Sequence, residues 1–563
     1  MKPLPTATKW GDRDSTRVKW TFAFKELVYS QLGIDQDTPK KTYTSKSPET
    51  IHEQPPDLPK EFFDHLGLFL RSTQISTDFW ERIENSLGQG YLELIQTRVA
   101  KLPPIAELVV YPHSHDEIVS VIQAAKTFGI PLCIRGGGTS VTHGVSQIPK
   151  GCTVLNITRM NRVLAINQTS MYITAQTGIL GPVLEDSLNS NGLTLGHFPQ
   201  SFEYSCLGGW IATRGAGQNS TLYGKIEEML MGLKIATGKG TTLEIKPAPA
   251  RATGPDFTHI FSGSEGAFGI ITEATLRVWP IPQTRKFSAF FFRSFEDGIN
   301  AYRELIQAGL RPAILRLSDA LETYFNLKAS SLMHDPPRKP SYFQQIGMKY
   351  LETRGFSEGK RCLGIMVNEG QSNLVSMTRK HAISLAKKHH GYHLGASPAK
   401  QWYDSRFDTP FLRDSIVDHG VLLETFETAV TWENLLPLYY AIQEVLRSEC
   451  PMIWTHGSHF YVNGANLYFT VLTPQEEGNE IYQFHRIRKK VLDTFLANGG
   501  TLSHHHGIGR SFNEWLPEEI GSAGMELLKD LKQSLDPEGI LNPGIFGLDR
   551  HQNVHGLQTS DSL

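Results

Sequence analysis

The sequence predicts an α+β protein built from at least two packed units. Its 563 residues exceed the size at which one hydrophobic core keeps growing. Hydrophobic residues make up 40% of the chain, which is ample material for two cores. Short helical and strand patterns alternate along the chain, and this alternation favours the α+β class.

Composition excludes several classes of protein. The net charge of -2 gives no electrostatic attraction to nucleic acid, so we expect no DNA or RNA partner. The five cysteines are scattered and form no C-x-x-C pair, which argues against a zinc ribbon, a redox dithiol or a disulfide framework. No apolar run reaches the ~18 residues of a membrane span, the start lacks a signal-peptide core, and residues 560–563 do not match a peroxisomal address. We expect a cytoplasmic protein, with peripheral membrane contact left open.

The first elements to be predicted follow a proline-rich start. Residues 55–59 are interpreted as an extended connector, and the first 60 residues are expected to depend on docking to the body for their order. Ser114 and Glu117 form a capping box for a helix that ends before Gly129, and residues 130–134 are a short buried strand. Further strands are predicted at residues 153–157, 171–174, 233–237 and 242–245, with a helix at 182–188.

A domain boundary is predicted near residue 282, after Pro280 and Pro282. Beyond it we expect a strand at 287–292, a helix at 295–305, a helix at 481–497, a strand leading into Ser503 and an amphipathic helix near 525–535. The predicted organisation is a partly helical segment at 1–97, a first domain at 98–282, a second at 283–500 and a C-terminal segment at 501–563.

Glycine-rich segments carry the clearest chemical signal. Gly136, Gly137 and Gly138, followed by Thr139 and Ser140, would let backbone N–H groups approach a pyrophosphate. Alone, this run is explained equally well by a plain turn. Two more glycine-rich segments, at 207–217 and 262–273, favour the binding interpretation over a plain turn. None of the three segments is a Walker or Rossmann motif. Residues 237–240 lack the spacing of a P-loop and are predicted to form a hairpin turn.

Together these three segments resemble the FAD-binding domain of the vanillyl-alcohol oxidase and p-cresol methylhydroxylase superfamily, over about residues 98–282. The resemblance implies a two-subdomain FAD-binding domain, a second α+β cap domain, and helical N- and C-terminal segments. It also implies noncovalent FAD, with His197 in contact rather than bonded. The residues implied to contact FAD are Ile134, Arg135, Gly136, Gly137, Gly138, Thr139, Ser140, His197, Gln200, Ser201, Ser205, Cys206, Gly209, Thr213, Arg214, Gly215, Ala216, Glu265, Gly266, Gly269, Ile270 and Ile271.

The C-terminal half narrows the resemblance. Residues 461–469 stand where the D-lactate and glycolate oxidising branch carries a metal-binding His-x-Gly-Asp-Gly-Asn-x-His strand, but Tyr461 and Tyr468 replace the imidazoles. With the run of three histidines at 504–506, this segment resembles the alkyldihydroxyacetonephosphate synthase family. The likeness runs over about residues 98–546 and includes segments 311–319, 411–414 and 424–428. It is weakest in the first 60 residues, where only a short Lys-Trp-Gly-Asp segment matches.

The resemblance implies a role for two arginines. Arg413 is expected to bind a substrate phosphate through its planar guanidinium; the alternative is a surface pair with Asp414. Arg316 lies in an apolar run and needs a partner, which a ligand or flavin would supply; the alternative is an ion pair with Asp319.

The remaining catalytic residues implied are Tyr461, His504, His505 and His506. Tyr461 is expected to be the general acid/base, helped by a nearby positive group; the alternative is an ordinary strand residue. On a strand, His504 and His506 would share a face opposite His505. A metal site or a solvated turn are alternatives, and no metal is expected because the paired imidazoles are absent.

The family's reaction exchanges the acyl chain of acyl dihydroxyacetone phosphate for a long-chain fatty alcohol, and FAD takes part covalently through N5 with no net redox change. These two lipids are therefore the expected substrates. One alternative is an FAD-dependent D-2-hydroxy acid dehydrogenase or oxidase, which shares the flavin domain. A catalytically silent flavin-binding or lipid-binding protein is the other. Chain-length preference and oligomeric state stay open, a homodimer being one option.

Overall fold

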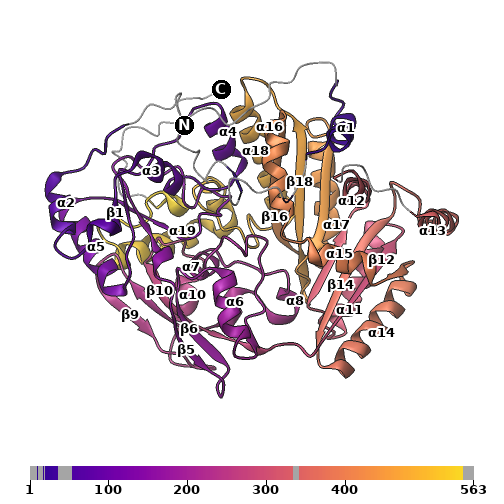
Figure 1. The fold of residues 1–563 in the computed structure, drawn as a ribbon, viewed down its shortest axis with the longest axis horizontal. Helices are drawn as coiled ribbons and strands as arrows, with labels where there is room; N and C mark the ends of the chain where they lie inside the picture. Colours follow the sequence, from indigo (N-terminus) through magenta and orange to yellow (C-terminus); the bar gives the residue numbers. More distant parts are fainter. Residues whose placement is uncertain (1–8, 11–16, 18–19, 36–53, 334–340, 549–563) are drawn as a thin grey trace.

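The fold is described from a computed structural model that covers residues 9–10, 17, 20–35, 54–333 and 341–548. Figure 1 shows two lobes side by side, the first from the N-terminal part of the chain and the second in the pink-to-orange part. The C-terminal segment, in yellow, returns to the first lobe.

The first sheet of the N-terminal lobe contains β1 (Ile75–Ser76), β2 (Leu108–Val110), β4 (Thr153–Asn156) and β3 (Leu132–Arg135), in that order. Strands β2, β4 and β3 are parallel, and α5 (His115–Phe128) connects β2 to β3. The hydroxyl of Ser114 accepts the N–H of Glu117, and Gly129 ends the helix at φ 69°. The helix predicted to end before Gly129 and the strands predicted at residues 130–134 and 153–157 are confirmed.

A second, antiparallel sheet of the N-terminal lobe has the order β5 (Val163–Asn167), β6 (Tyr172–Gln176), β10 (Ile270–Arg277), β8 (Leu230–Ala236) and β9 (Thr242–Ile245). The predicted hairpin between β8 and β9 is confirmed, since the N–H of Gly240 donates to the carbonyl of Thr237 at 2.9 Å. The remaining elements of this lobe are α6 (Gly181–Asn189), β7 (Leu193–Thr194), α7 (Leu207–Ala212), α8 (Ser220–Tyr223), α9 (Ile226–Met229), α10 (Phe257–Phe261) and β11 (Trp279–Pro280).

The second lobe is a seven-stranded antiparallel sheet covered by helices on both faces. Its strands are, in spatial order, β15 (Tyr392–Gly395), β12 (Thr284–Phe292), β14 (Cys362–Gly370), β13 (Ile314–Ser318), β17 (Met452–Ser458), β18 (Gly464–Pro474) and β16 (Val421–Thr431). Helices α11 (Phe295–Gln307), α14 (Ser372–Lys388), α17 (Trp432–Leu446) and α18 (Glu480–Ala497) pack on one face. Helices α12 (Ala320–Leu332), α15 (Ser397–Asp404) and α16 (Thr409–Asp418) pack on the other, and α13 (Tyr342–Thr353) projects from the lobe.

Segments near the N-terminus are divided between the lobes. Helix α1 (Phe22–Gln31) is capped by Thr21 and buries Phe24 and Val28 against α12 and α16 of the second lobe. It lies within the segment 1–97 that is predicted to be partly helical, and it docks on the second lobe. Helices α2 (Lys60–Leu66), α3 (Phe79–Asn85) and α4 (Tyr91–Arg98) follow, and α4 lies against α18 and β16.

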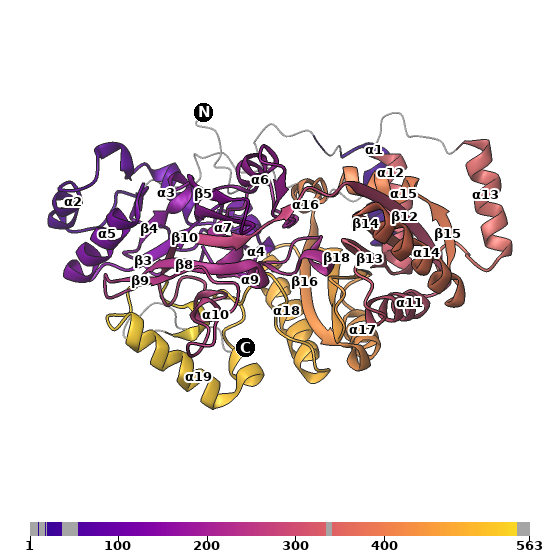
Figure 2. The same cartoon turned by 90° about the horizontal axis from the view of Figure 1, so that it is seen from below.

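The C-terminal segment completes the first sheet. Helix α19 (Leu516–Leu535), kinked at Gly521, runs along the first lobe in Figure 2. The N–H of Leu132 then donates to the carbonyl of Ile540 at 2.8 Å, so the chain end adds to the β3 edge. The predicted helices at 481–497 and 525–535 are confirmed, the second beginning earlier. The predicted strand into Ser503 is wrong, because residues 501–510 form a loop.

Candidate active site between the two lobes

The first glycine loop is packed against residues 204–206. A Cβ on Gly136 would overlap the sulfur of Cys206, and one on Gly137 would overlap the carbonyl of Tyr204, so only glycine allows this approach. Gly138 adopts φ 71°. Within the described residues, the backbone N–H groups of Gly136, Gly138 and Thr139 donate no hydrogen bond. The loop therefore offers free donors at the end of β3.

Other polar groups of the first lobe also lack partners. His197 is buried against Trp210 at 4.7 Å between ring centroids, and both its ring nitrogens are unpaired among the described residues. Burial lowers the pKa of His197 to about 3, so its ring is neutral. The buried hydroxyls of Ser262 and Ser264 are also unpaired in this part of the chain. A large polar cofactor such as FAD would satisfy such groups, so these residues fit it.

Several residues predicted to contact FAD also have partners within the protein. The Arg135 guanidinium is buried and donates to the carbonyl of Leu87, and the N–H of Ile134 donates to the Asn542 side chain. Ile270 and Ile271 are buried in β10, paired with β8.

Glu265 ties the third glycine segment to the loop after α18. Its carboxylate accepts the N–H of Ile508 at 2.7 Å and that of Gly509 at 3.0 Å. Burial raises the pKa of Glu265 to about 7, and these N–H donors limit the rise. Glu265 therefore positions the histidine-bearing loop.

One face of the second sheet carries polar side chains toward the first lobe. The register places Glu427 of β16 opposite Tyr468, Tyr468 opposite His456, and His456 opposite Ser318 of β13. Because side chains alternate along a strand, Arg316 shares this face with Ser318. The sheet thus aligns groups from four strands.

Arg316 is paired with Glu322, not with Asp319. Its Nη2 lies 2.8 Å from Oε1 of Glu322, and that same oxygen lies 3.1 Å from Nδ1 of His456. Burial alone would raise the pKa of Glu322, but Arg316 and His456 lower it to about 2. The alternative of an Asp319 pair is wrong because Asp319 caps α12 through the N–H of Glu322. Arg316 keeps 20% of its side chain exposed.

Residues 503–507 wrap around the carboxylate of Glu427. It accepts the backbone N–H of His504 at 2.9 Å, those of His505 and His506 at 3.1 Å, and the hydroxyl of Ser503 at 2.8 Å. The prediction that His504 and His506 share a strand face is therefore wrong. The side chains of His505 and His506 instead both approach Glu427, at 3.3 and 3.5 Å. Burial opposes ionisation of Glu427, but the imidazoles hold its pKa well below the usual range.

Tyr461 and His504 are hydrogen-bonded across this loop. Tyr461 lies in the turn between β17 and β18, and its hydroxyl oxygen is 2.9 Å from Nε2 of His504. Burial raises the pKa of Tyr461 and lowers that of His504 well below its usual value. His504 is therefore a neutral partner, and the nearby cation is Lys225, which donates to the carbonyl of His504 at 2.6 Å.

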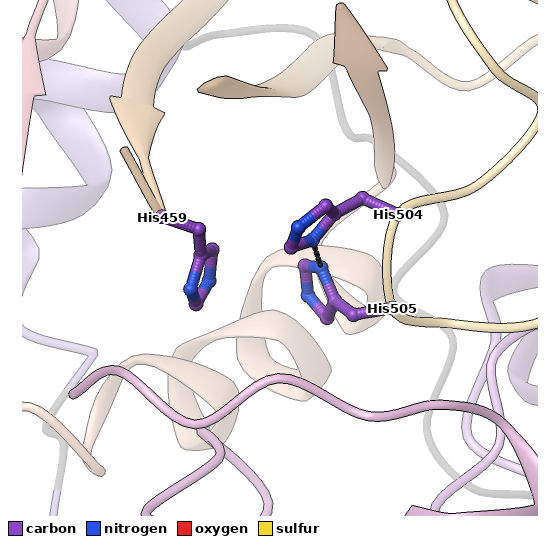
Figure 3. Close-up of side chains that lie close together, drawn as sticks. All are labelled: His459, His504 and His505. Carbon is purple, nitrogen blue, oxygen red and sulfur yellow. Dashed lines mark hydrogen bonds between the residues drawn. The ribbon is translucent and has the colours of Figure 1, made fainter. Parts of the chain in front are cut away.

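Sequence reasoning missed His459 at this site. Its Nδ1 lies 2.7 Å from the Ser220 hydroxyl, and its ring stacks on His504 at 5.1 Å. Figure 3 shows His459 facing the pair formed by His504 and His505. Its position two residues before Tyr461 was the one sequence feature that pointed to a place in this site. Two groups of described side chains could hold a metal ion: His459 with His504 and His505, and Glu427 with His505 and His506.

Arg413 is partly buried and contacts the glycine loop through Gln89. Its Nη atoms donate to the carbonyl and side chain of Gln89 and to Asp414 at 3.2 Å, so it is not a surface pair. The N–H of Gln89 in turn donates to the carbonyl of Ser140 at 2.7 Å. A cavity lies beyond this contact, between the first lobe, β16 and the histidine loop. Its lining residues are Val141, Thr142, Glu424, Thr425, Phe426, Glu427, Phe484, Arg488, His506, Ser511 and Phe512.

Comparisons with known proteins match both lobes. The FAD binding domain model matches residues 106–246, and the model of the C-terminal domain of FAD linked oxidases matches residues 281–545. The chain is 32% identical to an alkyldihydroxyacetonephosphate synthase of Dictyostelium discoideum, over 92% of this chain and 87% of the relative. The Trypanosoma brucei brucei enzyme of the same name is 30% identical, over 96% and 87%. The chain belongs to the alkyldihydroxyacetonephosphate synthase family.

The family's fold agrees with the structure. A solved alkyldihydroxyacetonephosphate synthase superposes with a TM-score of 0.80 at 29% identity, covering 96% of this chain and 97% of the other. This synthase-family chain is therefore an FAD-dependent enzyme with the predicted α+β architecture. A probable D-lactate dehydrogenase of Danio rerio is more distant, at 25% identity over 78% of this chain and 84% of the relative. Within the described residues, no helix is long and apolar enough to cross a membrane.

Proposed function

We propose that this enzyme exchanges the acyl chain of acyl dihydroxyacetone phosphate for a long-chain fatty alcohol, a step of ether-lipid synthesis. The observation that carries the proposal is the Tyr461–His504 hydrogen bond, because tyrosine stands where the hydroxy acid branch has a metal-binding imidazole. The names of its relatives support the same activity. When bound, FAD supplies the electrophilic ring that takes up and returns the substrate fragment without net redox change.

Tyr461 is the proposed general acid/base, and the structure provides a path for its proton. Because its pKa is raised, Tyr461 keeps its proton at neutral pH until a neighbouring base accepts it. His504 is neutral and presents Nε2 at 2.9 Å. On its other side, Nδ1 of His504 lies 3.0 Å from Nδ1 of His505. Transfer along this path requires His504 to carry its own proton on Nδ1 at rest.

Glu427 stabilises the charge that such a transfer creates. Its carboxylate lies 3.3 Å from Nδ1 of His505 and holds the loop through three backbone N–H groups. A proton that reaches His505 therefore forms an imidazolium beside a fixed negative charge. The proposed relay is Tyr461, His504, His505 and Glu427, which removes the proton next to the substrate ketone.

Two arginines are candidates for the substrate phosphate. The sequence assigns this role to Arg413, but its Nη atoms donate to Gln89 and Asp414, leaving only Nε without a partner among the described residues. Arg316 is partly exposed and lies opposite Ser458 in the strand that leads to Tyr461. We therefore assign the phosphate to Arg316 and the positioning of the glycine loop to Arg413.

The lipid substrates are also proposed to reach the enzyme from a membrane surface. Helix α13 projects from the second lobe and exposes Tyr342, Ile346 and Tyr350, at 72%, 48% and 51%. Apolar side chains on a projecting helix suit contact with lipid.

The test is an anaerobic reaction of the FAD-loaded enzyme with palmitoyl dihydroxyacetone phosphate and hexadecanol. We expect release of palmitate, and formation of the alkyl product only when the alcohol is added. Release of no palmitate, together with bleaching of the flavin by D-lactate, would overturn the proposal in favour of a hydroxy acid dehydrogenase.

A further inference from the structure

Three imidazoles of the active site come together from two separate segments. His459 follows β17, and His504 and His505 belong to the loop after α18. One ring nitrogen from each lies within 4.8 Å of one from each of the others. Figure 3 shows the three rings grouped, with His459 across from the other two. Three imidazoles around one point form a set of ligands that Zn²⁺ favours.

The surroundings hold these rings in a form that binds metal. The Ser220 hydroxyl engages Nδ1 of His459 at 2.7 Å, which leaves Nε2 as the nitrogen available to a ligand. Glu427, 3.3 Å from Nδ1 of His505, supplies the carboxylate that often supports a metal-binding histidine.

Charges of both signs lie near this point. Lys225 is the nearby positive side chain, and its Nζ binds the carbonyl of His504 and lies 3.2 Å from Glu227. The carboxylate of Glu427 is ionised, because its pKa lies well below the usual range. A divalent ion would therefore sit between neutral imidazoles with a buried anion behind them.

We propose that His459, His504 and His505 form an inhibitory binding site for a divalent transition-metal ion of the Zn²⁺ type. A metal–nitrogen bond of about 2.0–2.1 Å requires the rings to close around the ion. The ion takes a lone pair of His504, so it competes with the hydrogen bond from Tyr461. The ion is a competitor of the proton relay and not a catalytic component. Binding stands independently of the proposed function, whereas inhibition rests on it.

The binding test uses metal-free, FAD-loaded enzyme titrated with zinc chloride in a calorimeter. We expect one Zn²⁺ ion per chain, and a dissociation constant at least tenfold higher in His459→Ala. His381→Ala is the matched control, because His381 is exposed on α14, and it should bind like the wild type. Absence of a stoichiometric site in the wild type, or equal affinity in His459→Ala, would overturn the proposal.

A spectroscopic measurement covers the case in which His459→Ala does not fold. Cobalt(II) added to the wild-type holoenzyme should give intense absorption at wavelengths beyond the flavin bands, as expected of a four-coordinate site with nitrogen ligands. Weak bands of a six-coordinate hydrated ion would overturn the site. In activity assays, Zn²⁺ should inhibit exchange and a chelator should restore it. Tight binding without inhibition would leave the metal site standing and would contradict the Tyr461–His504 relay.

Discussion

The hydroxyl oxygen of Tyr461 lies 2.9 Å from Nε2 of His504, and this bond joins two segments that reach the site separately. Tyr461 comes from the turn between β17 and β18, whereas His504 belongs to the loop after α18. That loop is held by Glu427 of β16 through the N–H of His504. The position of the proposed catalytic pair therefore depends on a carboxylate from a third element.

Replacement of Tyr461 by phenylalanine should abolish most of the exchange activity. The change removes the hydroxyl that donates to His504 but keeps the ring. General acid–base catalysis contributes about 10²–10⁴-fold, so we expect a loss of about a hundredfold or more in product formation. The measurement is mass spectrometry of the alkyl product. Tyr482→Phe, at an exposed position on α18, is the control and should stay active. Full activity in Tyr461→Phe would rule out the relay.

Replacement of Glu427 by glutamine should destabilise the protein more than the same change at Glu424. Glu427 is ionised and accepts three backbone N–H groups, so an amide leaves part of this set unsatisfied, at a cost of about 2 kcal/mol. Burial raises the pKa of Glu424 on the same strand to about 7, so a neutral amide resembles its resting form. Thermal unfolding of the two holoenzyme variants measures the difference. Equal melting temperatures would contradict this account of Glu427.

Replacement of Arg413 by lysine should weaken FAD binding. Arg413 donates to Gln89, whose N–H holds the carbonyl of Ser140 in the glycine loop at 2.7 Å. Lysine cannot make the two-pronged contact, so the loop should lose its fixed position. We expect a dissociation constant for FAD raised about tenfold, measured by recovery of flavin fluorescence on dilution. Arg447→Lys, at an exposed ion pair, should have no effect. If the FAD affinity is unchanged and the KM for the phosphate substrate is raised, Arg413 binds the substrate phosphate and does not position the glycine loop.

Local patterns in the sequence predicted much of the first lobe. The capping of α5 by Ser114, the strands beside it and the turn at Gly240 depend on neighbours within a few residues, and such signals are present in the sequence. The three glycine segments also identified the FAD-binding domain, because close backbone packing at Gly136 and Gly137 tolerates no side chain.

Long-range contacts account for the errors at the site. The loop at His504 looked like a strand because the buried carboxylate that gathers its N–H groups lies 77 residues earlier. Asp319 was the nearer carboxylate to Arg316 in sequence, but it caps α12 and thereby brings Glu322 into the pair. Helix α1 was not located within the segment predicted to be partly helical, because its apolar face is completed by α12 and α16 of the distant second lobe.

The free energy of unfolding at mildly acidic pH should depend on the lowered pKa of the buried His456. Burial, and then the charge of Arg316, lower the pKa of His456 to about 4, whereas the unfolded value is about 6.5. Because the pKa is lowered in the fold, the contribution of His456 to the free energy of unfolding is fully present above pH 6.5. This contribution is lost as the pH falls toward 4. The loss is about 1.4 kcal/mol per pH unit, because only the unfolded chain takes up the proton. His456→Gln lacks this term.

The wild type should therefore exceed His456→Gln in stability at pH 7.5, and the gap should shrink by about 2 kcal/mol at pH 5.0. Urea unfolding of both holoenzymes at the two pH values measures the gap, and groups that titrate alike in both proteins cancel from the difference. Glu322 stays ionised over this range, since its pKa is about 2. A gap that does not change with pH would mean that the pKa of His456 is not lowered by folding, and a gap that widens at pH 5.0 would mean that His456 is an imidazolium in the fold, paired with Glu322.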